Sequence, residues 1–401
     1  MTDWLTLDAA DDLACAHYLE RNAEELYRRI THDYTRFVRV EDVAREAARL
    51  APGLVPGDAE LATERTLKLA DKKGLERRQG LLISKIAAHP KAGAHLCHAM
   101  LLPRADSAEA LARFRRDGKL DLGRARIERR GAAAIVTLSQ PDKLNCEDDT
   151  TLAAQETAID VVLMDPDSKI GILRGDLVQH PKYAGRHLFS SGINLTALYW
   201  GQISFMFYLT RDMGLVNKLY RGIARPDADP SEIAGGTTEK LWVGVVEGFA
   251  IGGGCQLLLV LDHVIAERDA YMTLPARKEG IIPGMANLRL PRLVGDRLAR
   301  QAILNDRRLP CDSPEGRLLC DEIVERGEVE AAIDRTVENL TTSGVVSAAG
   351  NRKALRIAQE PLDLFRQYLA LYAREQADCH FSPALIANLE RNWQAHQRKA
   401  S

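Results

Sequence analysis

The clearest indication of the fold class is the stretch Leu241-Trp-Val-Gly-Val-Val-Glu-Gly-Phe-Ala-Ile-Gly-Gly-Gly-Cys-Gln256. Its first six residues are apolar and rich in β-branched side chains, which predicts a buried strand. A glycine turn follows, and the run Cys255–Leu261 predicts a helix. A strand that reaches glycine at the entry to a helix is typical of α/β proteins with a mostly parallel sheet.

Strands and helices alternate on both sides of this stretch. Short apolar runs predict strands over Ala132–Leu138, Lys169–Arg174 and His263–Glu267. The pattern over Thr151–Met164 predicts an amphipathic helix. This alternation starts near Leu120 and indicates a mostly parallel sheet with helical layers.

Helical patterns dominate both flanks of this α/β region. Helices are expected over Leu13–Val38, over Ala59–Ala88 with Pro90 as its stop, and near Ser107–Arg116. From about Leu288 onward the apolar spacing again predicts helices. We therefore expect a helical N-terminal domain (1–120), an α/β core (121–330) and a C-terminal helical region that serves assembly (331–401).

Composition narrows the class of protein. The chain has 401 residues, of which 46% are hydrophobic and 27% charged, as is usual for a globular protein. The chain has 54 Lys and Arg residues against 56 Asp and Glu residues. It therefore lacks the excess of basic residues that is typical of proteins that bind nucleic acids. No apolar run approaches the ~18 residues of a membrane span, and the acidic start, Met1–Asp12, does not resemble a secretory leader.

The cysteines indicate the compartment. There are seven of them without a Cys-x-x-Cys pair, and this odd, scattered set predicts reduced thiols in a cytoplasmic protein. His95, Cys97 and His98 lie close together and leave a metal site as an alternative. Because no second cluster offers further ligands, we expect no metal here, and two histidines three residues apart commonly share one helix face.

Two glycine-containing segments, Phe189-Ser-Ser-Gly-Ile-Asn-Leu195 and Val246–Gln256, suit the binding of negative charge. In both, a strand-side segment meets glycine and then enters a helix, where free N–H groups and partial positive charge favour an anion. Two such N–H groups together can stabilise a developing oxyanion. The alternatives are plain structural turns or a dinucleotide-binding loop, but Leu257 stands where Gly-x-Gly-x-x-Gly needs its last glycine.

Four ordered segments resemble the crotonase (enoyl-CoA hydratase/isomerase) superfamily. They are Gln140–Asn145, Phe189–Leu195, Val243–Gln256 and Ala270–Leu293, and the resemblance covers roughly residues 124–330. It implies a crotonase-like core, built as a ββα spiral, that binds an acyl-CoA thioester. It also implies that the backbone N–H groups of Ile193 and Gly253 hold the thioester oxygen. Assembly into trimers or hexamers is a further expectation from this resemblance.

The chain departs from the hydratases of that superfamily. Hydratases place glutamates where this chain has Gln256 and Ala276. An amide does not titrate usefully and a methyl group carries no acidic proton, so hydration of an enoyl-CoA is not expected. The acceptor of a substrate proton stays unassigned, since Gln256 cannot serve and no histidine lies in either segment.

A long helical extension on a core without these glutamates resembles one branch of the superfamily, the dioxygenases of arylacetyl-CoA thioesters. That branch supplies dihydroxyphenylglycine for glycopeptide antibiotics. The resemblance implies that O2 reacts with a substrate enolate without a metal or another cofactor, and that an arylglyoxylate and CoA are released. The apolar run Ile203–Leu209 is a candidate wall of an O2 pocket. A thioesterase and a non-catalytic CoA-binding subunit are the alternatives.

Candidate site residues follow from these segments. Glu147 and Arg211 are candidates for contacts to the ring hydroxyls, and Gln256 for a contact to substrate or peroxide. Their alternatives are a helix-end charge, a surface arginine and a helix cap, respectively. Further candidates for substrate or CoA binding are His180, Lys182, Tyr183, Ser191, Gly192, Asn194, Gly252 and Gly254. Arg186 lies on the same loop as the first three and suits a phosphate equally well.

Overall fold

The computed structural model describes residues 12–231 and 236–399. The sequence expectation for the first residues of the chain therefore concerns residues outside the described ranges. Within these ranges, no helix is both long and apolar enough to cross a membrane.

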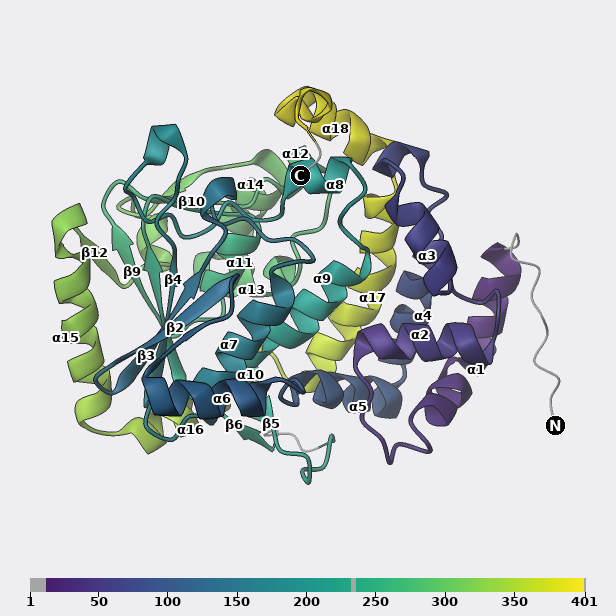
Figure 1. The fold of residues 1–401 in the computed structure, drawn as a ribbon, viewed down its shortest axis with the longest axis horizontal. Helices are drawn as coiled ribbons and strands as arrows, with labels where there is room; N and C mark the ends of the chain where they lie inside the picture. Colours follow the sequence, from purple (N-terminus) through teal and green to yellow (C-terminus); the bar gives the residue numbers. More distant parts are fainter. Residues whose placement is uncertain (1–11, 232–235, 400–401) are drawn as a thin grey trace.

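A seven-stranded sheet forms the centre of the α/β region (Figure 1), in the order β1-β2-β3-β4-β7-β9-β12. Its strands are β1 (Lys119–Asp121), β2 (Ala125–Arg130), β3 (Ala133–Leu138), β4 (Ile170–Gly175), β7 (Leu241–Val246), β9 (His263–Glu267) and β12 (Glu322–Val324). The strands from β3 to β12 pair in parallel, while β1 and β2 pair antiparallel with their neighbours. The four predicted strands and the mostly parallel sheet are confirmed. Strand β2 was not predicted, because its sequence Ala-Arg-Ile-Glu-Arg-Arg carries four charges.

Two smaller sheets accompany it. One holds β8 (Phe249–Ile251), β10 (Tyr271–Thr273) and β11 (Leu309–Pro310), and the other pairs β5 (Ile223–Ala224) with β6 (Thr237–Thr238).

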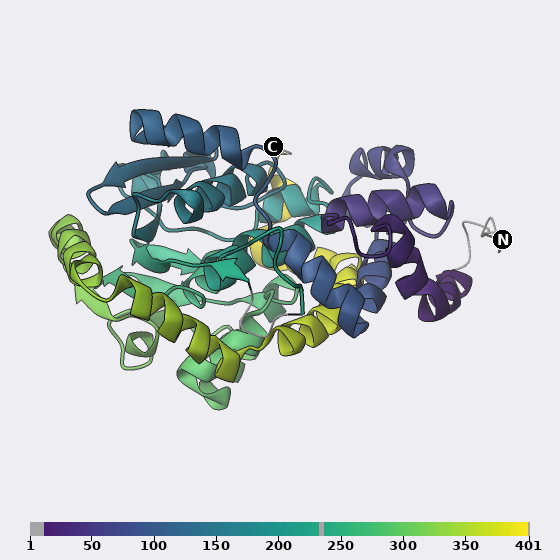
Figure 2. The same cartoon turned by 90° about the horizontal axis from the view of Figure 1, so that it is seen from below.

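Helices make up most of the remainder, and Figure 2 shows that the last ones run along one side of the molecule towards the N-terminal helices. The N-terminal helices are α1 (Asp12–Ile30), α2 (Val40–Leu50), α3 (Asp58–Arg65), α4 (Arg77–Ala88), α5 (Pro90–Leu101) and α6 (Ser107–Asp117). The helices of the central region are α7 (Leu152–Met164), α8 (Leu195–Tyr199), α9 (Met206–Thr210), α10 (Asn217–Arg221), α11 (Gly253–Leu258), α12 (Ala276–Glu279), α13 (Ala286–Val294) and α14 (Asp296–Asn305). The C-terminal helices are α15 (Val329–Thr342), α16 (Val345–Gln359), α17 (Leu362–His380) and α18 (Pro383–Trp393).

The sheet is buried on both faces. In β3, Ile135 points to a cluster that includes Val329 and Ile333 of α15, whereas Val136 points to the main core. In β7, Val243 joins the α15 side. This alternation follows from the two-residue period of a strand, and burial on both faces explains why the strands read as continuous apolar runs.

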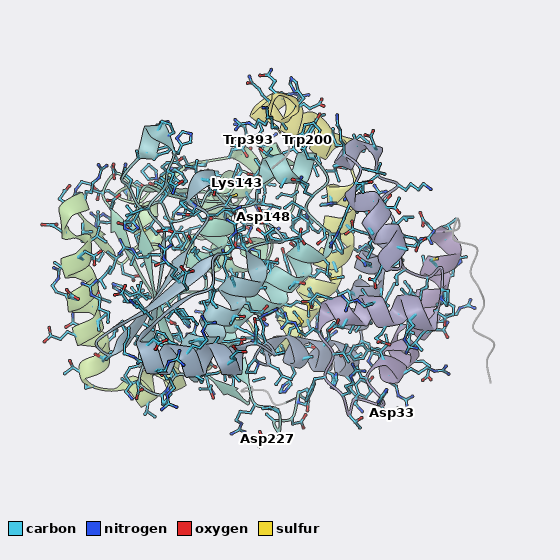
Figure 3. All side chains as sticks on the ribbon, viewed as in Figure 1. Asp33, Lys143, Asp148, Trp200, Asp227 and Trp393 are labelled. Atoms are coloured by element: carbon cyan, nitrogen blue, oxygen red, sulfur yellow. The ribbon has the colours of Figure 1, made fainter. Side chains whose placement is uncertain are left out.

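One apolar cluster extends through most of the chain. It runs from Cys15 in α1 through Phe205 to Phe365 in α17 and Ala395. Helix α17 packs against α4, so a C-terminal helix lies between the N-terminal helices and the core (Figure 1). The core is thus continuous across residue 120, and the division into three domains stays a prediction. Trp200 and Trp393, labelled in Figure 3, mark where α8 meets α18.

Two sequence expectations are corrected. The run expected over Ala59–Ala88 is divided into α3 and α4; α4 ends at Ala88 before Pro90 as expected, and Pro90 also begins the new helix α5, because the first position of a helix tolerates a residue without an N–H group. Helix α7 is confirmed over Leu152–Met164. The expected amphipathic pattern does not give it a polar face in solvent, because most of its residues are buried. Its polar residues Glu156 and Asp160 are buried. They pair with buried Lys218, whose Nζ lies 2.8 Å from Glu156 Oε1 and 2.7 Å from Asp160 Oδ1.

Replacing Lys218 by Met is expected to lower the free energy of unfolding by about 3–5 kcal/mol, because two carboxylates would then be buried with less compensation. Arg45→Met is the matched control, since Arg45 pairs with Asp42 at the surface and such pairs contribute about 0–1 kcal/mol. Urea unfolding followed by circular dichroism measures both. Equal losses in the two variants would contradict the assignment of a structural role to the buried cluster.

Candidate active site

The two glycine-containing segments lie side by side. Ser190 and Ala250 form an isolated parallel β-bridge, and the N–H group of Ile251 donates to the Ser190 carbonyl at 3.0 Å. A Cβ atom built on Gly192 would lie 3.0 Å from the Gly253 nitrogen. The close approach therefore requires glycine at 192, which also has a positive φ of 77°.

Both predicted oxyanion donors have free N–H groups. The Glu147 N–H donates to the Gly192 carbonyl and the Asn194 N–H donates to the Glu147 carbonyl, each at 2.8 Å, and the amide of Ile193 between them is not used. Gly253 is the first residue of α11, so its N–H has no acceptor within the helix. Neither amide donates a hydrogen bond to any residue in the described ranges. Such a pair can receive an oxygen that gains negative charge.

Arg211 connects the candidate residues beside these amides. Its Nε donates to Glu147 Oε1 at 2.9 Å, its Nη1 to Gln256 Oε1 at 2.9 Å, and its Nη2 to the Gly253 carbonyl at 2.8 Å. It begins a π-helical turn, η4 (Arg211–Val216), a rare local structure that is frequent at functional sites. Only 4% of Arg211 is exposed, so the alternative of a surface arginine is wrong.

Gly253 is required by this network. A Cβ atom built on Gly253 would lie 2.1 Å from Glu147 Oε2 and 3.1 Å from Arg211 Nη2. Gly284, in the segment Ala270–Leu293, is also close to the network, because a Cβ atom built on it would lie 2.6 Å from Gln256 Oε1. The backbone thus fits closely around the ion pair.

A pocket opens at these groups, with about 450 Å³ of empty space that is partly open to solvent. Its polar side carries the residues just described, and its other side is largely apolar. The lining residues are Glu147, Ile193, Phe207, Tyr208, Arg211, Asp212, Gly252, Gly253, Gln256, Leu274, Ala276, Glu279, Ile281, Ile282, Pro283, Gly284 and Tyr372. Six of these were candidates from the sequence, and Phe207 and Tyr208 belong to the apolar run that was expected to wall a pocket.

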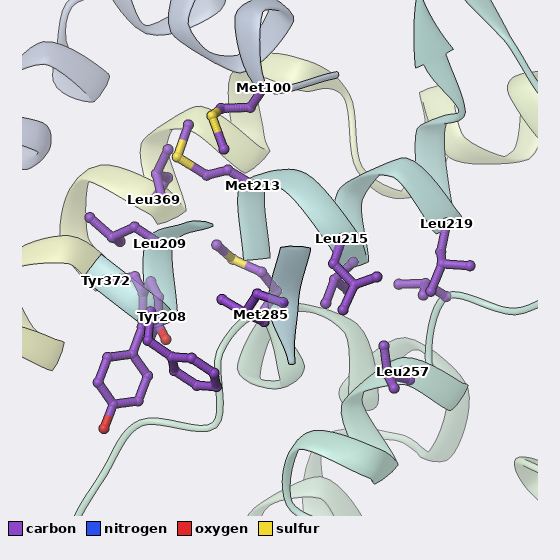
Figure 4. Packing of buried hydrophobic residues seen from close by; sticks show 14 of the residues in the cluster. Met100, Tyr208, Leu209, Met213, Leu215, Leu219, Leu257, Met285, Leu369 and Tyr372 are labelled. Carbon is purple, nitrogen blue, oxygen red and sulfur yellow. The ribbon is translucent and has the colours of Figure 1, made fainter. Parts of the chain in front are cut away.

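Two lining residues, Asp212 and Tyr372, were not predicted from the sequence. Tyr372 hydrogen-bonds to the Asp212 carboxyl, and burial raises the pKa of Asp212 despite the nearby Arg211 guanidinium. Asp212 directly follows Arg211 and was findable from the sequence. Tyr372 comes from α17, far along the chain, and no motif signals it; it lies near Tyr208 in the packing shown in Figure 4.

Other candidates lie outside the pocket lining. His180 and Lys182 are exposed on the 3-10 turn η3 (Pro181–Tyr183), and Tyr183 packs edge-on against Phe249. Arg186 is bound to Glu267, with 2.6 Å between its Nη2 and the carboxylate.

The neighbours of Ile193 have structural contacts. Asn194 caps α8 by accepting a hydrogen bond from the Ala197 N–H at 3.0 Å. The N–H group of Ser191 donates to the Leu144 carbonyl at 3.1 Å. Gly254 packs against Ser190, which a Cβ atom would approach to 2.8 Å.

The histidine pair of α5 has protein partners. His95 Nδ1 lies 2.8 Å from the Tyr27 hydroxyl, and its Nε2 lies 3.1 Å from the Tyr34 carbonyl. The described residues contain no group of three or more His, Cys, Asp or Glu side chains arranged to hold a metal ion. All seven cysteines are free thiols.

Comparison with known proteins identifies relatives of this fold. The family model for enoyl-CoA hydratase/isomerase matches residues 232–376. The (3,5-dihydroxyphenyl)acetyl-CoA 1,2-dioxygenase of Amycolatopsis orientalis is 44% identical over 92% of this chain and 84% of its own length. The short-chain-enoyl-CoA hydratase of Clostridium acetobutylicum is 25% identical over 59% of this chain and 82% of its own.

Solved structures share the fold. An enoyl-CoA hydratase/isomerase from Xanthobacter autotrophicus Py2 superposes with a TM-score of 0.55 at 21% identity, covering 69% of this chain and 96% of that one. An enoyl-CoA hydratase from Bacillus halodurans gives a TM-score of 0.54 at 22% identity, covering 67% and 99%. The crotonase-like fold class predicted from the sequence is confirmed. The chain belongs to the crotonase superfamily and, within it, to the family of the Amycolatopsis orientalis dioxygenase.

Proposed function

We propose that the chain is a dioxygenase that converts 3,5-dihydroxyphenylacetyl-CoA and O2 into 3,5-dihydroxyphenylglyoxylate and free CoA, without a metal or another cofactor. The observation that carries this proposal is the pocket in which two free amides, Ile193 and Gly253, lie beside the Arg211–Glu147 ion pair. The 44% identity to a dioxygenase of this substrate over 92% of the chain supports it.

The first step is formation of an enolate. The α-carbon of an arylacetyl thioester is acidic, because both the ring and the thioester delocalise the carbanion. Hydrogen bonds from Ile193 and Gly253 to the thioester oxygen favour the enolate further, and one such donor contributes roughly 2.7–4 kcal/mol in comparable sites.

The electron-rich enolate then reduces O2 directly. Electron transfer and recombination form a bond between the α-carbon and oxygen, and the terminal peroxide oxygen attacks the thioester carbonyl and expels CoA thiolate. Cleavage of the O–O bond and loss of the second α-proton leave the arylglyoxylate, so both atoms of O2 enter the acid. Phe207, Ile281 and Ile282 supply apolar surface for O2 in the pocket.

Recognition of the ring uses the buried ion pair. A buried phenolic hydroxyl needs a polar partner, and the Glu147 carboxylate and the Arg211 guanidinium provide an acceptor and a donor. Gln256 binds Arg211 through its carbonyl oxygen and so has its amide NH2 for substrate or peroxide. The exposed His180 and Lys182 and the partly buried Tyr183, with the segment glycines, stay proposals for contacts to CoA.

Oligomerisation is a separate proposal. Exposed apolar side chains lie on the C-terminal helices, among them Val346, Leu355 and Leu371. We propose that this surface joins copies of the chain into trimers or hexamers.

The dioxygenase proposal predicts one O2 consumed for each CoA released when the protein acts on 3,5-dihydroxyphenylacetyl-CoA. An oxygen electrode and a thiol reagent measure both quantities, and treatment with EDTA is expected to leave the rate unchanged. Release of CoA without consumption of O2 would instead identify a thioesterase. Binding of the thioester without any turnover would identify a non-catalytic subunit.

The Gly253→Ala variant is expected to lose at least about 100-fold in kcat, because its methyl group displaces the Glu147 carboxylate beside an oxyanion donor. Gly350→Ala is the matched control, since a Cβ atom at this position in α16 meets nothing within 4 Å. Oxygen uptake compares the two variants. A Gly253→Ala enzyme as active as the control would refute the proposed oxyanion-binding role of the Ile193 and Gly253 amides.

The assembly proposal predicts a mass of three or six chains in multi-angle light scattering. Val346→Asp combined with Leu355→Asp is expected to reduce this mass, because charged groups would be placed in an apolar contact. A monomeric wild-type protein would refute the proposal.

A further inference from the structure

Glu279 is a carboxyl group in the pocket that the mechanism above leaves without a role. It is the last residue of the short helix α12, and its side chain lines the pocket. The other two carboxyl groups of the pocket, Glu147 and Asp212, accept hydrogen bonds from Arg211. The carboxyl group of Glu279 forms no hydrogen bond or ion pair with any residue that the structure describes, and only its backbone N–H is engaged, with the Pro275 carbonyl. A carboxyl group held in a pocket without a protein partner is free to act on a ligand.

The side chain of Glu279 lies close to the segment that carries the proposed oxyanion donor Gly253. Glu279 Oε2 lies 4.0 Å from where a Cβ atom of Gly252 would be, and Gly252 directly precedes the predicted donor Gly253. Ala276 is three residues before Glu279 in α12, so the two side chains share one face of the helix. Both line the pocket.

The surroundings give this carboxyl the properties of a base that works near neutral pH. Burial raises the pKa of Glu279 to about 8, with a further contribution from the negative charge of Asp306 and an opposing one from Lys278. General acid–base groups are most effective when their pKa lies near the working pH.

We propose that Glu279 is the base that removes the α-proton of the thioester substrate. In this step the α-carbon–hydrogen bond breaks, the proton passes to a carboxylate oxygen of Glu279, and the electron pair forms the enolate whose oxygen is held by Ile193 and Gly253. The proposal rests on the proposed function in its choice of substrate. It also accounts for proton transfer in a chain that has Gln256 and Ala276 in place of the hydratase glutamates.

Other pocket groups serve this role less well. Glu147 and Asp212 both accept hydrogen bonds from the Arg211 guanidinium, so their carboxyl groups are already engaged by a protein partner. Gln256 carries an amide, which does not titrate. Glu279 therefore combines position, freedom from partners and basicity.

Exchange of the α-protons under anaerobic conditions isolates this step from the reaction with O2. The wild-type protein and Glu279→Gln are incubated in D2O with 3,5-dihydroxyphenylacetyl-CoA, and NMR follows the loss of the α-CH2 signal. Glu279→Gln is expected to exchange at least about 100-fold more slowly, the range of general base catalysis. Glu109→Gln, which removes an exposed carboxylate of α6, is the control and is expected to match the wild type.

Calorimetric titration with 3,5-dihydroxybenzoyl-CoA, a thioester without α-hydrogens, verifies that the Glu279→Gln pocket still binds. Retained affinity with slow exchange supports the proposal, whereas exchange at the wild-type rate overturns it. A wild-type protein that exchanges α-protons but consumes no O2 would refute the dioxygenase proposal and leave the assignment of Glu279 standing.

Discussion

The guanidinium of Arg211 is the interaction on which the site depends. A buried charge is costly unless opposite charge and hydrogen bonds compensate it. Arg211 obtains these from Glu147, Asp212, Gln256 and the Gly253 carbonyl. The same contacts fix the carboxylate and the amide at the pocket, and they also fix the peptide unit that follows an oxyanion donor. Loss of any one of these partners would leave the buried charge of Arg211 less completely balanced.

This dependence explains the glycines around the site. The Glu147 carboxylate occupies the space that a side chain at position 253 would need, and Gln256 and Asp212 do the same at position 284. The glycines at 253 and 284 are thus consequences of a buried polar network as well as of local backbone geometry. In the proposed reaction, this rigid arrangement holds the donors in place before charge develops, which is the basis of electrostatic preorganisation.

The helices outside the α/β core help to build the pocket. Helix α17 packs against α4 on one side and supplies Tyr372 to the pocket on the other. Its Gln376 also accepts a hydrogen bond at 2.8 Å from the N–H group of Ile282, which lines the pocket, and its His380 lies 3.1 Å from the Tyr208 hydroxyl. The N-terminal extension and the C-terminal helices therefore support the apolar wall around the substrate, where exclusion of water would protect a reactive peroxide.

The strands, the two glycine-containing segments and the residues that follow them could be predicted from the amino-acid sequence. Local chain geometry dictates these features: β-branched runs bounded by turns form strands, and glycine before a helix leaves N–H groups free. Which polar side chains contact one another depends on tertiary packing and could not be predicted. Nothing local distinguishes buried Arg211 from a surface arginine, or Glu279 in the pocket from an exposed helix-end glutamate. The Asp212–Tyr372 contact and the burial of Glu156 and Lys218 depend on residues distant in the chain, whose pairing is set by packing of the whole core.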